Sequence, residues 1–179
     1  KDNFEHMGYK INVVVTPNDC NTCHPAEVKQ YSESKKAHAI KNLRNNPVYH
    51  TLVSTITGVK KIEKGKIISE KPSDETLNET CFACHGTKIE VKGMKNVSTQ
   101  MGDVSVPVLT NWPNQGVGRE NPDGSLGACT ACHPRHGFSI EVARKPYTCA
   151  QCHLEPDVPA WNVYKESKHG NIYFSKNHE

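Results

Sequence analysis

The cysteines of this chain of 179 residues all fall into one repeated motif. They form four C-x-x-C pairs, and a histidine follows each pair directly. The cysteines are Cys20, Cys23, Cys81, Cys84, Cys129, Cys132, Cys149 and Cys152, and the histidines are His24, His85, His133 and His153. C-x-x-C-H is the attachment signal of haem c, in which two thiols bond to one porphyrin and the histidine binds its iron. The sequence therefore predicts four covalently attached haem c groups.

Two other chemistries use paired cysteines. Two zinc sites of four thiolates each, or an extracellular disulfide framework, would explain the pairs but not the histidines. We therefore favour haem, which is attached to protein thiols outside the cytoplasm. The expected location is extracellular or at the cell surface, with the periplasm as the alternative. The charged opening KDNFEH is interpreted as the start of a mature chain after removal of a signal peptide.

The composition indicates what kind of core to expect. Apolar residues make up 35% of the chain, below the roughly 45–50% of ordinary globular domains. We expect one tetrahaem cytochrome domain over residues 1–179, mostly irregular with short α-helices and a few short strands. In this multihaem cytochrome c fold, the four bound haems replace an aliphatic core. An N-terminal arm over residues 1–18 and a haem-free loop and strand segment over residues 86–128 complete the expected layout.

Charge and hydropathy exclude several partners. A formal net charge of +3 without a basic stripe argues against nucleic acid. The longest apolar runs, INVVV and VSVPVL, are far shorter than the roughly 20 residues of a membrane span. The sequence shows no Ser/His/Asp set, phosphate loop or paired-carboxylate motif, so no catalytic residue is predicted.

Six histidines lie outside the four motifs: His6, His38, His50, His136, His169 and His178. A second histidine saturates a haem iron and makes it an electron carrier, and six are enough for four haems. The three methionines are alternative axial ligands. A tyrosine, a serine three residues later and a lysine precede His38 and His169 alike, so these two share a repeated frame.

The spacing of the spare histidines suggests which haem each one reaches. The segment AEVKQYSESKKAHAIKNL predicts a continuous helix, which at ~1.5 Å per residue puts His38 about 20 Å from His24. His38 should then bind a different haem, and so should His169 unless Pro156 and Pro159 fold the chain back. On a helix, His133 and His136 share a face. His136 cannot pass through its own haem plane, so it should bind a neighbouring haem.

Other segments carry weaker signals. STITGVKKIEKGKIIS predicts a hairpin near Gly58 or Gly65, and PSDETLNETCFACHG predicts a short helix capped by Ser73 or Asp74. Residues 91–110 are expected as short strands or extended chain. Residues 111–127, rich in Asn, Pro and Gly, are expected as loop.

Several segments resemble the octahaem hydroxylamine oxidoreductases. CTACHPRHGFSIEVARKPYTCAQCH with the later YKESKHG is similar to that family's fifth and sixth haem motifs. DCNTCHPAEVKQYSESKKAHAIKNLRNNP and CFACH are similar to its first and second. The resemblance covers most of residues 19–50 and 120–172, through C-H-x-R-H-x-F-S, A-R-K-P and S-K-H-G. It implies that His38, His136 and His169 are distal haem ligands.

The departures from that family shape the expected function. ENPDGSLGA lacks the cysteines of the family's catalytic haem motif, and the third, seventh and eighth motifs are absent. So is the C-terminal helical region that supplies the tyrosine cross-linked to the catalytic haem. We expect extracellular electron transfer through bis-histidine haems and no enzyme activity. The alternatives are a soluble periplasmic carrier, or a small haem oxidoreductase acting on a nitrogen or sulfur compound.

One haem lacks an expected distal ligand. The family's second motif is followed by a histidine, whereas GTKIEVKGMKNVSTQMGD has none. His6 and His50 are the candidates, with His178 next. A flexible arm could donate His6 to a neighbour, and such a head-to-tail contact generates a filament. The chain is similar in size, haem count and histidine layout to small extracellular cytochromes that form conducting filaments. Expected partners are identical subunits, other cytochromes or an extracellular electron acceptor.

Overall fold

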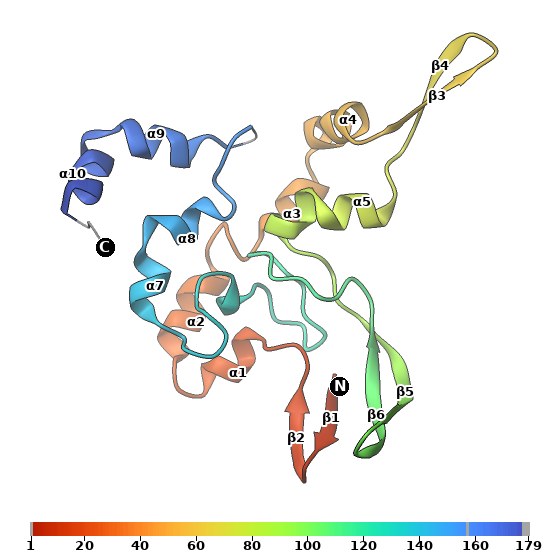
Figure 1. The fold of residues 1–179 in the computed structure, drawn as a ribbon, viewed down its shortest axis with the longest axis vertical. Coiled ribbons are helices and arrows are strands. Elements are labelled where there is room, and N and C mark those ends of the chain that lie inside the picture. Colours follow the sequence, from red (N-terminus) through yellow and green to blue (C-terminus); the bar gives the residue numbers. More distant parts are fainter. Residues whose placement is uncertain (1, 157, 177–179) are drawn as a thin grey trace. The chain divides into compact units, whose positions relative to one another are not determined.

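The computed structural model describes residues 2–156 and 158–176. The chain divides into two compact units, Lys1–Ala131 and Cys132–Glu179, and the division falls inside the third C-x-x-C-H motif. The chain consists of short helices and two-stranded hairpins joined by long irregular connections (Figure 1). This confirms the expected mixed, largely irregular architecture. The single tetrahaem domain over residues 1–179 stays a prediction.

The first unit contains short helices with recognisable start signals. They are α1 (Pro17–Asn21), α2 (Pro25–Ser32), α3 (Ala39–Arg44), α4 (Pro47–Ile56), α5 (Asp74–Glu79) and α6 (Cys81–His85). Proline is the first residue of three of these helices, where its missing N–H costs no hydrogen bond. Ser73 accepts a hydrogen bond from the Thr76 N–H at 3.1 Å, which confirms one of the two predicted caps of α5.

The continuous helix predicted through His38 is wrong. The chain leaves the helical path after Ser32, the last residue of α2, and α3 begins only at Ala39. Ser34 Oγ accepts from the Ala37 N–H at 3.3 Å, and His38 Nε2 lies 2.9 Å from the Ser32 carbonyl oxygen. These side chains bind backbone groups that a helix would use, so they favour a break. The distance from His24 that the helix implied therefore does not hold.

Three hairpins complete the first unit (Figure 1). They are β1 (Asn3–His6) with β2 (Tyr9–Asn12), β3 (Val59–Glu63) with β4 (Lys66–Glu70), and β5 (Val91–Thr99) with β6 (Gly102–Leu109). The predicted hairpin at Gly65 and the extended chain over residues 91–110 are confirmed. The N-terminal arm is an ordered hairpin, because Asp2 accepts hydrogen bonds from the Val13 and Val14 N–H groups at 3.1 and 2.8 Å.

The buried core of the first unit is small and partly polar. Its buried apolar side chains are Val14, Ala37, Ile40, Val53, Ile89 and Ala128. The connection over residues 111–127 is irregular, as predicted, yet it supplies Asn114, Arg119 and Asn121 to the interior. A loop with fixed hydrogen bonds therefore occupies the place that an apolar element would normally fill.

The second unit packs through aromatic rings. It contains α7 (Ile140–Arg144), α8 (Pro146–Ala150), α9 (Ala160–Glu166) and α10 (Lys168–Lys176). Neighbouring rings in this cluster have centroids 5.2–6.5 Å apart, and the cluster consists of Tyr147, Trp161, Tyr164, Tyr173 and Phe174. Aromatic pairs at these distances contribute energy beyond the burial of their surface, so this cluster holds α8, α9 and α10 together.

No helix within the described ranges is long and apolar enough to cross a bilayer.

Candidate functional site

Three of the four C-x-x-C-H motifs fold as a single helical turn. The His24 N–H donates to the Cys20 carbonyl at 2.9 Å, and the His153 N–H donates to the Cys149 carbonyl at 3.0 Å. The second motif is itself a helix, α6. Residues i, i+3 and i+4 share one face of a helix, so each turn presents two thiols and an imidazole together. That is the arrangement needed to bind one haem.

The third motif differs from the others. Cys129–Ala131 forms the 3₁₀-helix η1, and residues 132–139 contain no helix but a turn, in which the Phe138 N–H donates to the Pro134 carbonyl at 2.7 Å. The interpretation that His133 and His136 share a helix face is therefore wrong. Pro134, which follows His133, cannot donate an amide hydrogen bond, and this favours a turn over a helix.

The competing cysteine chemistries gain no support from the fold. All eight cysteines are free thiols. Among residues 2–156 and 158–176, no group of three or more His, Cys, Asp or Glu side chains is placed to hold a metal ion.

Exposed surface is larger than a compact chain would leave. The accessible surface is 12733 Å², whereas a compact protein of 19.9 kDa exposes roughly 8,700 Å² and two separate compact units of these lengths roughly 10,000 Å². Large apolar side chains such as Leu52, Ile56 and Phe138 are exposed. Large planar apolar groups bound to the motifs would cover such surface, so the residues present fit covalently bound haem.

The first and third attachment sites meet. Burial, the neighbouring charge of Cys20 and a hydrogen bond with the Cys20 side chain raise the pKa of the Cys129 thiol to about 11. The positive charge of Arg119 acts on the same thiol in the opposite direction. Two haems bound through Cys20 and Cys129 would therefore be close neighbours.

The loop over residues 111–127 fixes the second motif. The Val117 and Gly118 N–H groups donate to the carbonyls of Cys84 and His85 at 2.9 and 3.1 Å. Asn114 Nδ2 donates to the Phe82 carbonyl at 2.9 Å. A Cβ atom on Gly116 would collide with the backbone of Gly86, so this close approach requires glycine. The loop therefore holds the second motif through hydrogen bonds to the backbone carbonyls of the motif.

Helix α4 contacts the same motif. The Tyr49 hydroxyl lies against the Cys81 thiol, and burial with this contact raises the pKa of Tyr49. The Tyr49 and Phe82 ring centroids are 6.4 Å apart. Sequence reasoning missed Tyr49, because a single aromatic residue on a short helix has no motif. Its neighbour His50, a candidate ligand, is exposed and has Nε2 2.7 Å from the Arg44 carbonyl oxygen.

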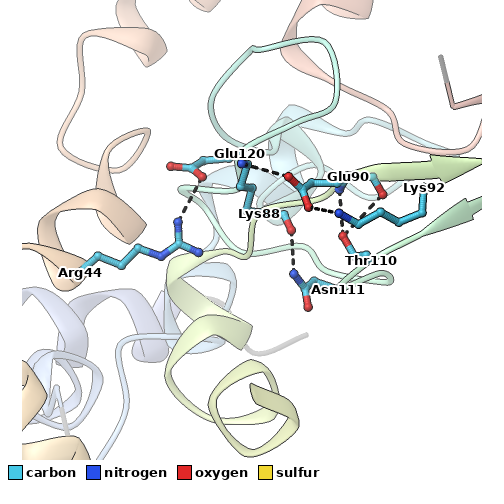
Figure 2. A network of polar contacts seen from close by, with 7 residues as sticks. All are labelled: Arg44, Lys88, Glu90, Lys92, Thr110, Asn111 and Glu120. Carbon is cyan, nitrogen blue, oxygen red and sulfur yellow. Dashed lines mark hydrogen bonds and ion pairs between the residues drawn. The ribbon is translucent and has the colours of Figure 1, made fainter. Parts of the chain in front are cut away.

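A polar network ties α3 to the irregular core (Figure 2). Arg44 pairs with Glu120 at 3.2 Å. Lys92 and Lys88 contact the Glu90 carboxylate at 2.6 and 3.1 Å and lower the pKa of Glu90 to about 2. The side chains of this network are exposed, so their ion pairs add little to the free energy of unfolding. Their main effect is to fix the positions of the segments that they join.

The repeated frame before His38 and His169 has a common local structure. Ser34 and Ser167 accept hydrogen bonds from the Ala37 and Gly170 N–H groups at 3.3 and 3.1 Å. In the second unit, the Trp161 N–H donates to the His153 carbonyl at 2.9 Å, so the chain folds back after the fourth motif. This was the alternative left open for His169, and the argument for a distant haem does not apply to it.

The remaining histidines outside the four motifs lie in different parts of the fold. His6 is exposed and lies beside the turn of the β1–β2 hairpin, while His136 and His169 are exposed in the second unit. His178 lies outside the described residues. The structure does not bring the predicted distal ligands together with the motif histidines into metal-binding clusters among the residues it describes. Their ligand roles stay predictions.

Family models match both halves of the chain. Residues 19–106 match "Cytochrome c554 and c-prime", and residues 117–179 match "Seven times multi-haem cytochrome CxxCH". Each matched range contains two of the four motifs. A solved "Hypothetical multiheme protein" superposes with a TM-score of 0.83 and 53% identity, over 97% of this chain.

A curated protein is more distantly similar. The "Probable nitrite reductase-hydroxylamine oxidoreductase fusion protein" of Kuenenia stuttgartiensis is 34% identical over 121 residues, or 58% of this chain. The present chain spans only 14% of that protein and 32% of the solved multiheme chain. The similarity therefore concerns a part of each relative.

Proposed function

We propose that this chain, which is similar to multihaem c-type cytochromes and distantly similar to a protein of the nitrite reductase–hydroxylamine oxidoreductase type, transfers electrons through four covalent haems. The observation that carries the proposal is the set of four C-x-x-C-H motifs, three of them folded as matching helical turns. The bound haems would supply reversible one-electron chemistry at their irons.

The chain's own residues would attach and orient these groups. The eight motif cysteines form the thioethers, and His24, His85, His133 and His153 are the proximal ligands. His38, His136 and His169 serve as distal ligands, which leaves one position for His6 or His50. Contact between Cys20 and Cys129 supports a short electron path between two of the sites.

We further propose an extracellular filament. C-type cytochromes typically function outside the cytoplasm, and the exposed His6 beside a projecting hairpin turn is suited to reach a second copy of the chain. A ligand supplied head-to-tail adds subunits without closing a ring. Replacing His6 with Ala should yield single subunits with one under-ligated haem, while Lys10→Ala, a matched control at an exposed position of the same hairpin, should still assemble. Filaments of His6→Ala seen by electron microscopy would contradict this role.

The electron-transfer proposal is tested by the ferric spectrum. Bis-histidine ligation predicts wholly low-spin haem and no spectral change on adding nitrite, hydroxylamine or carbon monoxide. A high-spin band would instead favour a small oxidoreductase acting on a nitrogen or sulfur compound. Two observations support the oxidoreductase as a second candidate: the Kuenenia relative is named as a nitrite reductase-hydroxylamine oxidoreductase fusion, and the sequence has no histidine between His85 and His133.

A further inference from the structure

A permanently charged side chain is buried where the first and third attachment sites meet. Arg119 has an exposed fraction of 0%, the largest side chain buried to that extent. Its guanidinium stays protonated at every pH that a folded protein meets. The Gly127 N–H, two residues before Cys129, donates to the Arg119 carbonyl at 2.6 Å, and the Arg119 side chain donates to Val15, just before the helix that contains Cys20. The positive charge of Arg119 also acts on the Cys129 thiol, which itself contacts Cys20. The interior of the first unit therefore carries a fixed positive charge beside two motifs.

The guanidinium is held rigidly. Nε donates to Asn121 Oδ1 at 2.7 Å, Nη1 to the Asn114 carbonyl at 2.7 Å and Nη2 to the Val15 carbonyl at 2.5 Å. The Trp112 ring lies below it, with its centroid 5.5 Å away. These three acceptors are amide oxygens, and together they fix the position of the group. Arg119 cannot swing into solvent as a surface arginine does.

We propose that Arg119 raises the reduction potentials of the haems bound through Cys20 and Cys129, an inference that rests on the proposed function. Adding an electron lowers the positive charge at an iron, so a nearby cation favours the reduced form. The low dielectric of a buried site strengthens this effect, and nearby charge is one way in which proteins set haem potentials. Arg119 would make these two haems stronger electron acceptors than they would be without it.

The test is a spectroelectrochemical titration of the haem-loaded protein. Arg119→Gln removes the charge and should move the titration steps of two haems to lower potential. Arg119→Lys keeps the charge with fewer hydrogen bonds and should restore most of the shift. Lys95→Gln, which removes a charge from an exposed position on β5, is the matched control and should leave the titration unchanged.

A second variant covers the case in which Arg119→Gln fails to fold. Asn121→Asp places a carboxylate against Nε while Arg119 remains, and should lower the same two steps. Wild-type potentials in either folded variant, or equal shifts in Arg119→Lys and Arg119→Gln, would overturn the proposal. Loss of haem from both neutralising variants would assign Arg119 to folding and overturn it as well. Fewer than four haems on the wild-type chain would instead refute the proposed function.

Discussion

Single residues in the irregular loop hold the motifs in place. Gly127 has a φ of +99°, and a Cβ there would collide with the Tyr31 ring, whose hydroxyl donates to the Val117 carbonyl at 2.5 Å. The Tyr31 side chain thus links α2 to the loop that contacts the second motif. Glycine at position 127 is required both by conformation and by space.

Gly127→Ala should therefore destabilise the folded chain by about 1–3 kcal/mol, from strain and overpacking together. Thermal unfolding of the variant measures the loss. Gly124→Ala is the matched control: its φ is +84°, but no atom lies within 4 Å of the added Cβ, so only the strain should appear. Equal losses in the two variants would contradict the contact with Tyr31.

Glu90 gives a pH dependence with a definite sign. Its pKa falls from 4.5 to about 2 because of Lys92 and Lys88, so its contribution to stability is complete above pH 4.5. That contribution is lost as the pH falls from 4.5 towards 2. Glu90→Gln should flatten this part of the stability curve, by a small amount because the group is exposed. Glu75→Gln, outside the network of Figure 2, should flatten it less.

At the residue level, the sequence marks the expected attachment sites but not the residues that surround them. The motif cysteines and histidines are recognisable because haem attachment demands a strict local spacing. Arg119 and Tyr49 were missed because their roles depend on contacts between segments far apart in the chain. No spacing rule marks an arginine that donates to Val15 across 104 positions.

Among the elements, the serine that precedes His38 and His169 has a clear structural role at a helix end. Ser167 ends α9 and accepts from the Gly170 N–H in the first turn of α10. The two helices therefore meet at a sharp corner with His169 just beyond it. A capping serine replaced by alanine typically costs about 1 kcal/mol.

Ser167→Ala should lower the free energy of unfolding by about 1 kcal/mol. Chemical denaturation followed by circular dichroism measures this change. Ser175→Ala, in the last turn of α10, removes a serine that bonds only to Ile172 within the helix and should have a smaller effect. A larger loss from Ser175→Ala would contradict the capping role of Ser167.

Helix ends also explain the wrong element predictions. The absence of Pro and Gly over residues 26–43 favoured one helix, but the side chains of Ser34 and His38 bind backbone groups and break it. Hairpins were easier to predict, since Lys64 and Gly65 supply the two positive φ angles, 49° and 77°, of a tight turn.

For the whole molecule, the sequence predicted a chain without a conventional core, and the structure agrees. A small set of buried apolar residues and a polar loop centred on Arg119 form the interior of the first unit. In the second unit, a partly exposed aromatic cluster joins the helices. Attached haems would bury apolar surface that the chain leaves exposed, so we expect them to contribute to the stability of the fold.

The most direct test of four covalent haems is the intact mass of the purified chain under denaturing conditions. Thioether-bound haem survives unfolding, whereas non-covalent haem and zinc are lost. We expect one species with the mass of the chain plus four haems. A mass equal to the bare chain, or to the chain with fewer haems at full occupancy, would contradict the assignment of a haem to every C-x-x-C-H motif.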